Sequence, residues 1–153
     1  MRRQRFCRDL LYRGQAEQTP SATHGATCLV VKVRPDLMIS PKTGRVVLVD
    51  FKTTSAQNYA HFVGTIEQYD YDRQADLYSD LLGAARFIII GGQKKSPFAV
   101  WQFEATPAPG LIEQGRKKYE RLVKAYVQQK ARPCQPIAPN LLKQLLVSTQ
   151  SRI

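Results

Sequence analysis

Two aspartates and a lysine, in two short segments, are the residues of this chain whose types and spacing could do chemistry. The first segment is Arg34-Pro35-Asp36 and the second is Asp50-Phe51-Lys52. Carboxylates are hard oxygen ligands that hold Mg²⁺, or Mn²⁺, with several waters left in the coordination shell. Such a metal binds a phosphate oxygen and lowers the pKa of its bound water. The pattern therefore indicates metal-dependent hydrolysis of a phosphodiester.

Lys52 follows Asp50 by two residues, so both side chains point to the same face if the segment is a strand. In that position the amine can orient or deprotonate the attacking water and stabilise the charge of the transition state. An Asp-x-Lys sequence alone is commonly a surface ion pair. The run 46–51 is apolar enough for a central strand, however, where a charge is costly unless it has a function.

Neighbouring strands must bring the two segments together. Leu37-Met38-Ile39 and the valine-rich run 46–51 predict strands, and Ser40-Pro41-Lys42-Thr43-Gly44 between them predicts a hairpin turn. Pairing of these strands would place Asp36 close to Asp50. We therefore expect one site built on a strand hairpin.

The rest of the chain alternates between strand and helix patterns, which predicts a mixed α/β domain. Glycines and prolines divide these patterns, and Gly83 follows the longest apolar stripe as a helix stop. The expected strands are 27–33, 86–90 and 98–103, and the expected helices are 55–62 with Ser55 as its cap, 66–82, a basic helix 111–129 and a short helix 140–146.

Composition fits a folded chain with an anionic partner. Of 153 residues 43% are hydrophobic and 23% charged, which excludes wholesale disorder, and the formal net charge is +11. A positive field of this size favours nucleic acid first and an anionic membrane second, although a basic protein that merely stays soluble would look similar. No apolar run approaches the roughly 20 residues of a membrane span, so we expect no membrane partner.

The cysteines and the first residues of the chain bear on its location. Cys7, Cys28 and Cys134 have no CxxC spacing, which argues against a zinc site and a disulfide framework. The N-terminal Met-Arg-Arg-Gln-Arg is followed by no apolar signal core. We expect a cytoplasmic protein of a bacterial or phage-infected cell.

Three blocks of this sequence, in order, resemble the PD-(D/E)XK nuclease superfamily, and within it the exonuclease VIII (RecE-type) branch. They are Val31-Lys32-Val33-Arg34-Pro35-Asp36, Val49-Asp50-Phe51-Lys52-Thr53-Thr54 and the stretch from Tyr69 to Asp80. The resemblance covers roughly residues 25 to 125. It implies a restriction-endonuclease-like α/β core, with a mixed central sheet flanked by helices.

The resemblance also implies roles for individual residues. Asp36 and Asp50 would hold Mg²⁺ or Mn²⁺ together with the backbone carbonyl of Phe51, and Lys52 would be catalytic. The family's Gln-x-x-x-Tyr element is matched by Gln74 and Tyr78, which share a helical face and would position the lysine and the DNA strand. We further expect DNA contacts from Thr53, Thr54, Arg34, Lys94 and Lys95, and from the basic residues of helix 111–129.

The chain departs from the family at its N-terminal end. Relatives place a further acid or histidine on a helix before the first catalytic strand, and here Glu17 and His24 are the candidates. We therefore divide the chain into a basic segment 1–24, a truncated remnant of such an upstream region, a nuclease core 25–130 and a tail 131–153. Three cysteines are too few for the branch that carries an iron–sulfur cluster.

Together these features predict a metal-dependent exodeoxyribonuclease that resects linear duplex DNA in recombination or phage replication. The resemblance implies 5′ to 3′ polarity, a ring-shaped homo-oligomer and a single-strand annealing protein as partner. Two alternatives stay open: a catalytically weak or inactive DNA-binding module, and an endonuclease of the same superfamily.

Overall fold

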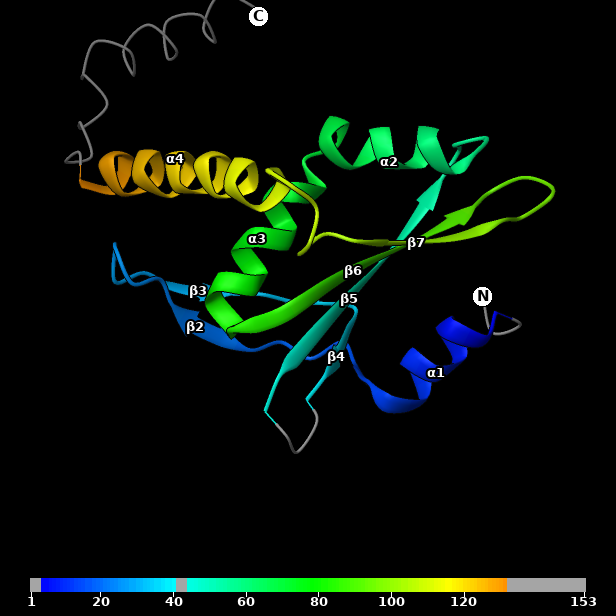
Figure 1. Cartoon of the computed structure of the whole chain (residues 1–153). Helices are drawn as coiled ribbons and strands as arrows, with labels where there is room; N and C mark the ends of the chain where they lie inside the picture. The colour runs from blue at the N-terminus through cyan, green and yellow to red at the C-terminus, as the bar shows by residue number, and fades with distance from the viewer. Residues whose placement is uncertain (1–3, 41–43, 132–153) are drawn as a thin grey trace, which may run out of the picture.

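A mixed β-sheet lies at the centre of the molecule, with helices on both faces. The computed structural model describes residues 4–40 and 44–131. The chain order is α1 (Arg5–Arg13), β1 (Gln15–Ala16), β2 (Ser21–Thr23), β3 (Val30–Lys32), β4 (Leu37–Ile39), β5 (Val46–Thr54), α2 (Tyr59–Gln68), α3 (Tyr71–Leu82), β6 (Ala84–Gln93), β7 (Val100–Glu104) and α4 (Leu111–Ala131), as Figure 1 shows. The predicted α/β class, with a mixed central sheet flanked by helices, is confirmed.

The sheet has five strands in the order β1-β4-β5-β6-β7, and β2 and β3 form a separate antiparallel pair. Strand β5 runs parallel to β6, and the other neighbours in the larger sheet are antiparallel. A parallel pair needs a crossover connection, and α2 and α3 supply it between β5 and β6. The segment before residue 25 contributes β1 to this same sheet, where it pairs with β4.

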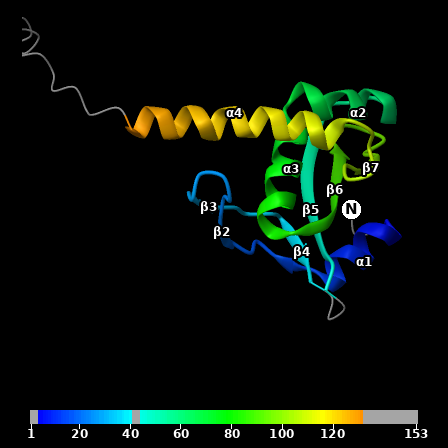
Figure 2. The ribbon, with the colours of Figure 1, turned by 60° about the vertical axis from the view of Figure 1, so that its left-hand side comes forward.

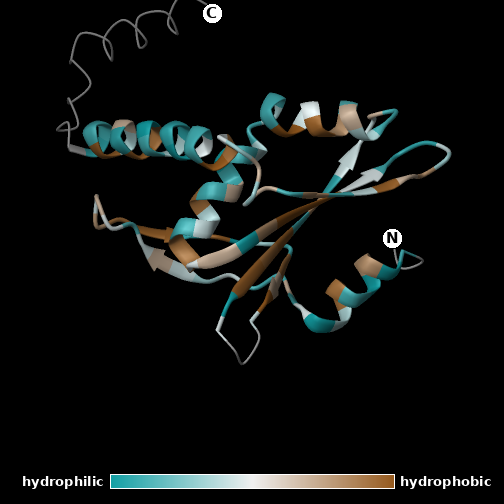
Figure 3. Cartoon of the chain, in the orientation of Figure 1, coloured by the Kyte–Doolittle hydropathy of each residue, from teal (hydrophilic) through white to brown (hydrophobic). Residues whose placement is uncertain are grey.

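Alternation along the strands divides the core into two clusters, one on each face of the sheet. Leu48, Phe87 and Ile89 face α2 and α3, whereas Val49 and Ile88 lie with Cys7 of α1 on the other face. Figure 3 shows the apolar residues following the central strands, with polar residues on the outer sides of the helices. Asp50 follows Leu48 by two residues, so its side chain belongs to the face that α2 and α3 cover.

Helix α4 packs across α3 and extends beyond it, above the β2–β3 pair (Figure 2). The close approach of the two helices depends on Gly115. A Cβ atom at this position would lie 2.4 Å from the backbone oxygen of Asp72. No helix among residues 4–40 and 44–131 is long and apolar enough to cross a membrane.

Several predicted elements differ from those observed. Residues 55–62 form no Ser55-capped helix: α2 begins at Tyr59, and the Asn58 side chain caps it by accepting from His61 N at 2.8 Å. The expected helix 66–82 is two helices, because Asp70 adopts a left-handed conformation at φ 55° between them. The predicted strand 27–33 is reduced to 30–32, and β2 had no counterpart in the prediction. Residues 41–43 of the predicted turn, the predicted helix 140–146 and Cys134 lie outside the described residues.

Candidate active site

The structure brings the two aspartates of the sequence pattern to neighbouring strands. Strand β4 pairs with β5 in the register Leu37–Val49, Met38–Leu48 and Ile39–Val47. One further step in this register places Asp36 opposite Asp50. Asp36 stands immediately before β4, and its Oδ2 accepts a hydrogen bond from the Phe51 backbone N–H at 2.6 Å. The predicted hairpin therefore joins both acids at one end of β4.

Lys52 and Asp50 form a close ion pair on the face covered by α3. The Lys52 Nζ lies 2.6 Å from Asp50 Oδ2. Asp50 is only 3% exposed, so its charge depends on this partner. Burial raises the pKa of Asp50 above its ordinary value; the Lys52 ammonium opposes this rise, and the charge of Asp36 adds to it. The site thus concentrates negative charge where solvent screens it little.

Gln74 connects the two members of the ion pair. Its Nε2 donates to Asp50 Oδ1 at 2.9 Å, and its Oε1 accepts from Lys52 Nζ at 3.0 Å. One amide side chain therefore fixes the carboxylate and the ammonium relative to each other. Gln74 can reach both because α3 starts anew after Asp70 and runs back along the sheet toward the start of β6, instead of continuing the direction of α2 (Figure 1).

An aromatic ring completes the surroundings of the lysine, but it belongs to Tyr71. The Lys52 Nζ lies 4.7 Å from the centre of the Tyr71 ring, a cation–π distance. Tyr78, the tyrosine expected at the site, packs its ring against Phe87 with centroids 6.4 Å apart. No hydrogen bond joins Tyr78 to Asp50, Lys52 or Gln74. The sequence prediction chose Tyr78 because the resemblance pointed to it, although Tyr71 lies three residues before Gln74 and therefore on the same face of α3.

The residues expected to contact DNA have different surroundings. Thr53 is exposed on β5, whereas Thr54 is buried and its Oγ1 accepts from Ala56 N at 3.1 Å.

The basic residues expected to contact DNA also differ from one another. Arg34 forms an ion pair with Glu17. Lys94 and Lys95 are exposed in the loop after β6, and neither lies within 4 Å of a carboxylate in the described part of the chain.

Two of the basic residues of helix α4 form ion pairs with carboxylates of α3, which their sequence pattern did not indicate. Arg116 lies 2.9 Å from Asp80 and 3.1 Å from Asp76, and Lys118 lies 2.8 Å from Asp72. These two cations hold α4 to α3. Their charges are thus partly neutralised by carboxylates of α3, two of which, Asp72 and Asp76, are fully buried.

Neither upstream candidate for a third acidic or histidine ligand joins the site. The Glu17 carboxylate pairs with Arg34. The His24 ring lies in the loop after β2, where its Nδ1 is 2.8 Å from Thr27 Oγ1. Within residues 4–40 and 44–131, no three side chains among His, Cys, Asp and Glu are clustered as a metal site would require. Of the expected acidic ligands, Asp36 and Asp50 are the two that the strand register places opposite each other.

Comparisons with known proteins bear on the fold. No family model matches the chain, and no curated protein matches it. A solved structure from Eubacterium rectale, described as a "putative exonuclease", is 15% identical with a TM-score of 0.64; the match covers 89% of this chain and 59% of that one. The structure of SSO0001 is 18% identical with a TM-score of 0.39 and covers 58% of this chain and 39% of that chain.

The present chain thus spans less than two thirds of the length of either neighbour. At so low an identity, the likeness to the Eubacterium rectale protein concerns the arrangement of helices and strands. The chain shares the fold of that protein.

Proposed function

We propose that this chain is a Mg²⁺-dependent nuclease that hydrolyses phosphodiester bonds of DNA, and that it acts as an exonuclease on linear duplexes. The observation that carries the proposal is the meeting of Asp36, Asp50 and Lys52, from two strand segments, in one partly buried site. A surface ion pair needs no second carboxylate opposite it and no amide that binds both of its members. The fold shared with a protein described as a "putative exonuclease" supports the same proposal.

The charges of the site fit a divalent cation. Lys52 supplies one positive charge near two carboxylates, and no Lys or Arg nitrogen of the described residues lies within 4 Å of the Asp36 carboxylate. Mg²⁺ is commonly held by one or two carboxylates with water and substrate phosphate completing its shell. Asp36 and Asp50 would hold the ion, and when bound it would polarise the phosphate and acidify a water.

The geometry of β5 offers the Phe51 carbonyl as a third ligand. In a strand, the N–H and C=O of one residue point to the same side. Because the Phe51 N–H faces Asp36, the Phe51 C=O faces the same side, where the chain before β4 holds Pro35. Proline has no N–H to donate, so this carbonyl is left available on the side where the carboxylates lie.

Lys52 is the residue that we assign to the reacting phosphate and water. Its ammonium group is held by Asp50, by Gln74 and by the face of Tyr71. From this position it can orient the attacking water and stabilise the negative charge of the transition state. Asp50 and Gln74 keep the side chain in place, because a long lysine would otherwise sample many rotamers.

Cleavage of linear duplex DNA by the purified chain tests this function. We expect loss of linear DNA with Mg²⁺ and none with a chelator, and we expect supercoiled circles to stay intact. Asp50→Asn and Lys52→Met should each lower the rate at least about a hundredfold, the usual scale for loss of an acid–base or charge-stabilising group. Asp9→Asn, an exposed residue of α1, is the control for the same chemical change and should keep the wild-type rate.

Two results would overturn the proposal. DNA binding without loss of DNA at any Mg²⁺ or Mn²⁺ concentration would favour a binding module. Full activity in folded Asp50→Asn or Lys52→Met would reject the site. Cleavage of circles would retain the nuclease and replace the exonuclease by an endonuclease.

The wider biological setting is part of the proposal. Resection in recombination or phage replication, 5′ to 3′ polarity, a ring-shaped assembly and a single-strand annealing partner follow from the resemblance of the sequence blocks. A measurement of the mass in solution and a comparison of substrates labelled at either end would test the assembly and the polarity.

A further inference from the structure

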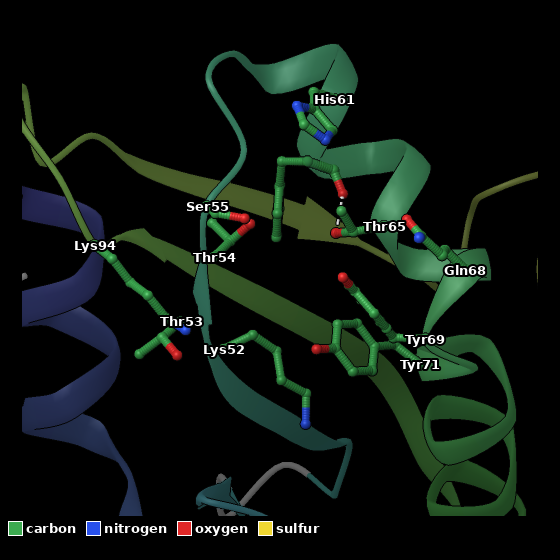
Figure 4. A pocket seen from close by; sticks show the side chains of 11 residues that line it. Lys52, Thr53, Thr54, Ser55, His61, Thr65, Gln68, Tyr69, Tyr71 and Lys94 are labelled. Atoms are coloured by element: carbon green, nitrogen blue, oxygen red, sulfur yellow. Dashed lines mark hydrogen bonds between the residues drawn. The ribbon is translucent and has the colours of Figure 1, made fainter.

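A pocket of about 280 Å³ opens beside Lys52, between the end of β5 and helix α2. Figure 4 shows its two sides: Lys94 and Thr53 stand opposite Tyr69 and Tyr71, with α2 above them. The volume is near the lower end of small-ligand pockets, which begin at about 300 Å³. It suits a group the size of one nucleotide.

The lining of this pocket is polar and carries no negative charge. Its residues are Lys52, Thr53, Thr54, Ser55, His61, Phe62, Thr65, Gln68, Tyr69, Tyr71 and Lys94, and none of them is an aspartate or a glutamate. Two lysines and several hydroxyl groups therefore face one space. Ammonium and hydroxyl donors of this kind are the groups that bind phosphate oxygens.

The opposite side of the pocket can accommodate a nucleobase. Tyr69 is 57% exposed, and its ring centroid lies 5.8 Å from that of Tyr71. Exposed aromatic rings stack on bases of any sequence because every base has a π-face. The floor is rigid: the Phe62 ring is buried and stacks on Trp101 with centroids 5.7 Å apart.

The pocket and the carboxylate site share Lys52. Its amine bonds to Asp50 and Gln74, and its side chain is also part of the pocket lining. A strand whose phosphate is at Asp36 and Asp50 would therefore have its next nucleotide at this opening.

We propose that the pocket binds one nucleotide of the DNA strand, next to the phosphodiester that is cut. Its phosphate lies toward Lys94 and Thr53, and its base lies against Tyr69 and Tyr71. This inference rests on the proposed nuclease function and adds a second subsite to it. A consequence is that a released deoxynucleoside monophosphate competes with DNA for the enzyme.

Titration of the full chain with deoxyadenosine 5′-monophosphate, in the absence of metal and DNA, tests the pocket by amide NMR shifts. We expect millimolar binding, with shifts gathered at residues 52–55, 61–69 and 94. Deoxyadenosine and inorganic phosphate, each alone, should bind about tenfold more weakly, because each makes half of the contacts. Lys94→Gln should weaken nucleotide binding about tenfold, the usual effect of losing one charge-assisted hydrogen bond.

The control is Lys32→Gln, which removes the same charge from an exposed residue of β3 outside the pocket. It should leave the dissociation constant unchanged. No shifts at the pocket residues, equal binding of the nucleoside without phosphate, or equal weakening by Lys32→Gln and Lys94→Gln would each overturn the proposal.

The titration separates this inference from the nuclease function, since it needs no cleavage. A chain that binds the nucleotide here but leaves DNA intact would refute the nuclease and keep the pocket as a nucleotide site. A chain that cleaves DNA but shows no such shifts would keep the nuclease and refute the subsite.

Discussion

At the scale of single residues, the geometry of the site depends on a bridging amide. Gln74 forms hydrogen bonds with both Asp50 and Lys52, and these two residues also form a direct ion pair with each other. A buried carboxylate and a half-buried ammonium with a common hydrogen-bonding partner are fixed more firmly than either group would be alone. The arrangement accounts for a charged pair beside the apolar residues of β5, where an unpaired charge would be costly.

Two substitutions of Tyr78 distinguish a catalytic role of its hydroxyl group from a packing role of its ring. The sequence predicts Tyr78 as catalytic, and in the structure its ring packs on Phe87 at the edge of the core. Because the ring contact survives in Tyr78→Phe, we expect this variant to keep wild-type cleavage and stability. Tyr78→Ala should lower the free energy of unfolding by about 3 kcal/mol, as for other aromatic truncations in cores.

Cleavage rates and urea unfolding of the two variants check this prediction. A stable Tyr78→Phe protein that loses cleavage would show that the hydroxyl is used, as the sequence pattern predicts. Tyr71→Phe is the companion variant, and it should also retain activity because a phenyl ring keeps the cation–π contact with Lys52.

At the scale of elements, sequence patterns predicted the parts of the site that depend on period and turn chemistry. The strands at 37–39 and 46–51 are confirmed because alternation and β-branched residues indicate strands reliably. The long helix α4 and the stop at Gly83 are confirmed for comparable reasons. These local rules suffice to bring Asp36 to Asp50.

The break between α2 and α3 could not be predicted from these local patterns. Apolar spacing continues through residues 66–82, whereas Asp70 takes up a left-handed conformation that no repeat marks. Asp tolerates this conformation better than most residues, but its tolerance does not tell where a helix turns. The direction of α3 after this turn places Tyr71 beside Lys52. This direction depends on tertiary packing and could not be predicted from the local sequence.

The contact between α3 and α4 gives a test of packing at the element scale. Gly115→Ala would place a methyl group 2.4 Å from the Asp72 carbonyl oxygen, which belongs to a helix backbone and cannot move aside. We expect the free energy of unfolding to fall by about 1–3 kcal/mol. Chemical denaturation measures the change.

Gly64→Ala is the matched control on α2, because a Cβ at this position meets nothing within 4 Å. This variant should gain about 0.5–1 kcal/mol, since alanine favours a helix interior over glycine. A Gly115→Ala protein as stable as the wild type would contradict the close packing of α3 and α4.

The same helix contact should give stability a pH dependence. Burial, followed by the nearby charge of Asp80, raises the pKa of Asp76 to about 7, although Arg116 opposes the rise. The unfolded chain has an ordinary aspartate pKa near 3.9, so the folded state binds an extra proton between these values. Stability from this group is therefore present at low pH and falls as the pH rises toward the folded pKa.

We expect the wild type to gain stability relative to Asp76→Asn as the pH falls from 8 to 5, by thermal unfolding of both. Glu104→Gln is the control, because Glu104 lies on β7 and is not one of the charges that shift the pKa of Asp76. A hydrogen bond from Arg86 holds the pKa of the Glu104 carboxyl below its ordinary value. Its contribution should stay constant over this range. A difference between wild type and Asp76→Asn that does not vary with pH would contradict the raised pKa of Asp76.

At the scale of the whole molecule, the basic residues behind the net charge of +11 serve different purposes. Arg116 and Lys118 neutralise carboxylates of α3, so they stabilise the fold. Lys94 and Lys95 are exposed on the loop next to the pocket beside Lys52, and neither pairs with a carboxylate of residues 4–40 or 44–131. A positive composition predicted an anionic partner, but only the structure separates the cations that could meet it from those that hold helices together.

Anomalous scattering from crystals of the chain grown with Mn²⁺ decides whether Asp36 and Asp50 form one cation site. We expect a manganese peak between the two carboxylates, in contact with both, that disappears in Asp50→Asn crystals. Manganese bound elsewhere with none at these carboxylates, or a peak that persists unchanged in Asp50→Asn, would show that the two aspartates do not share a cation.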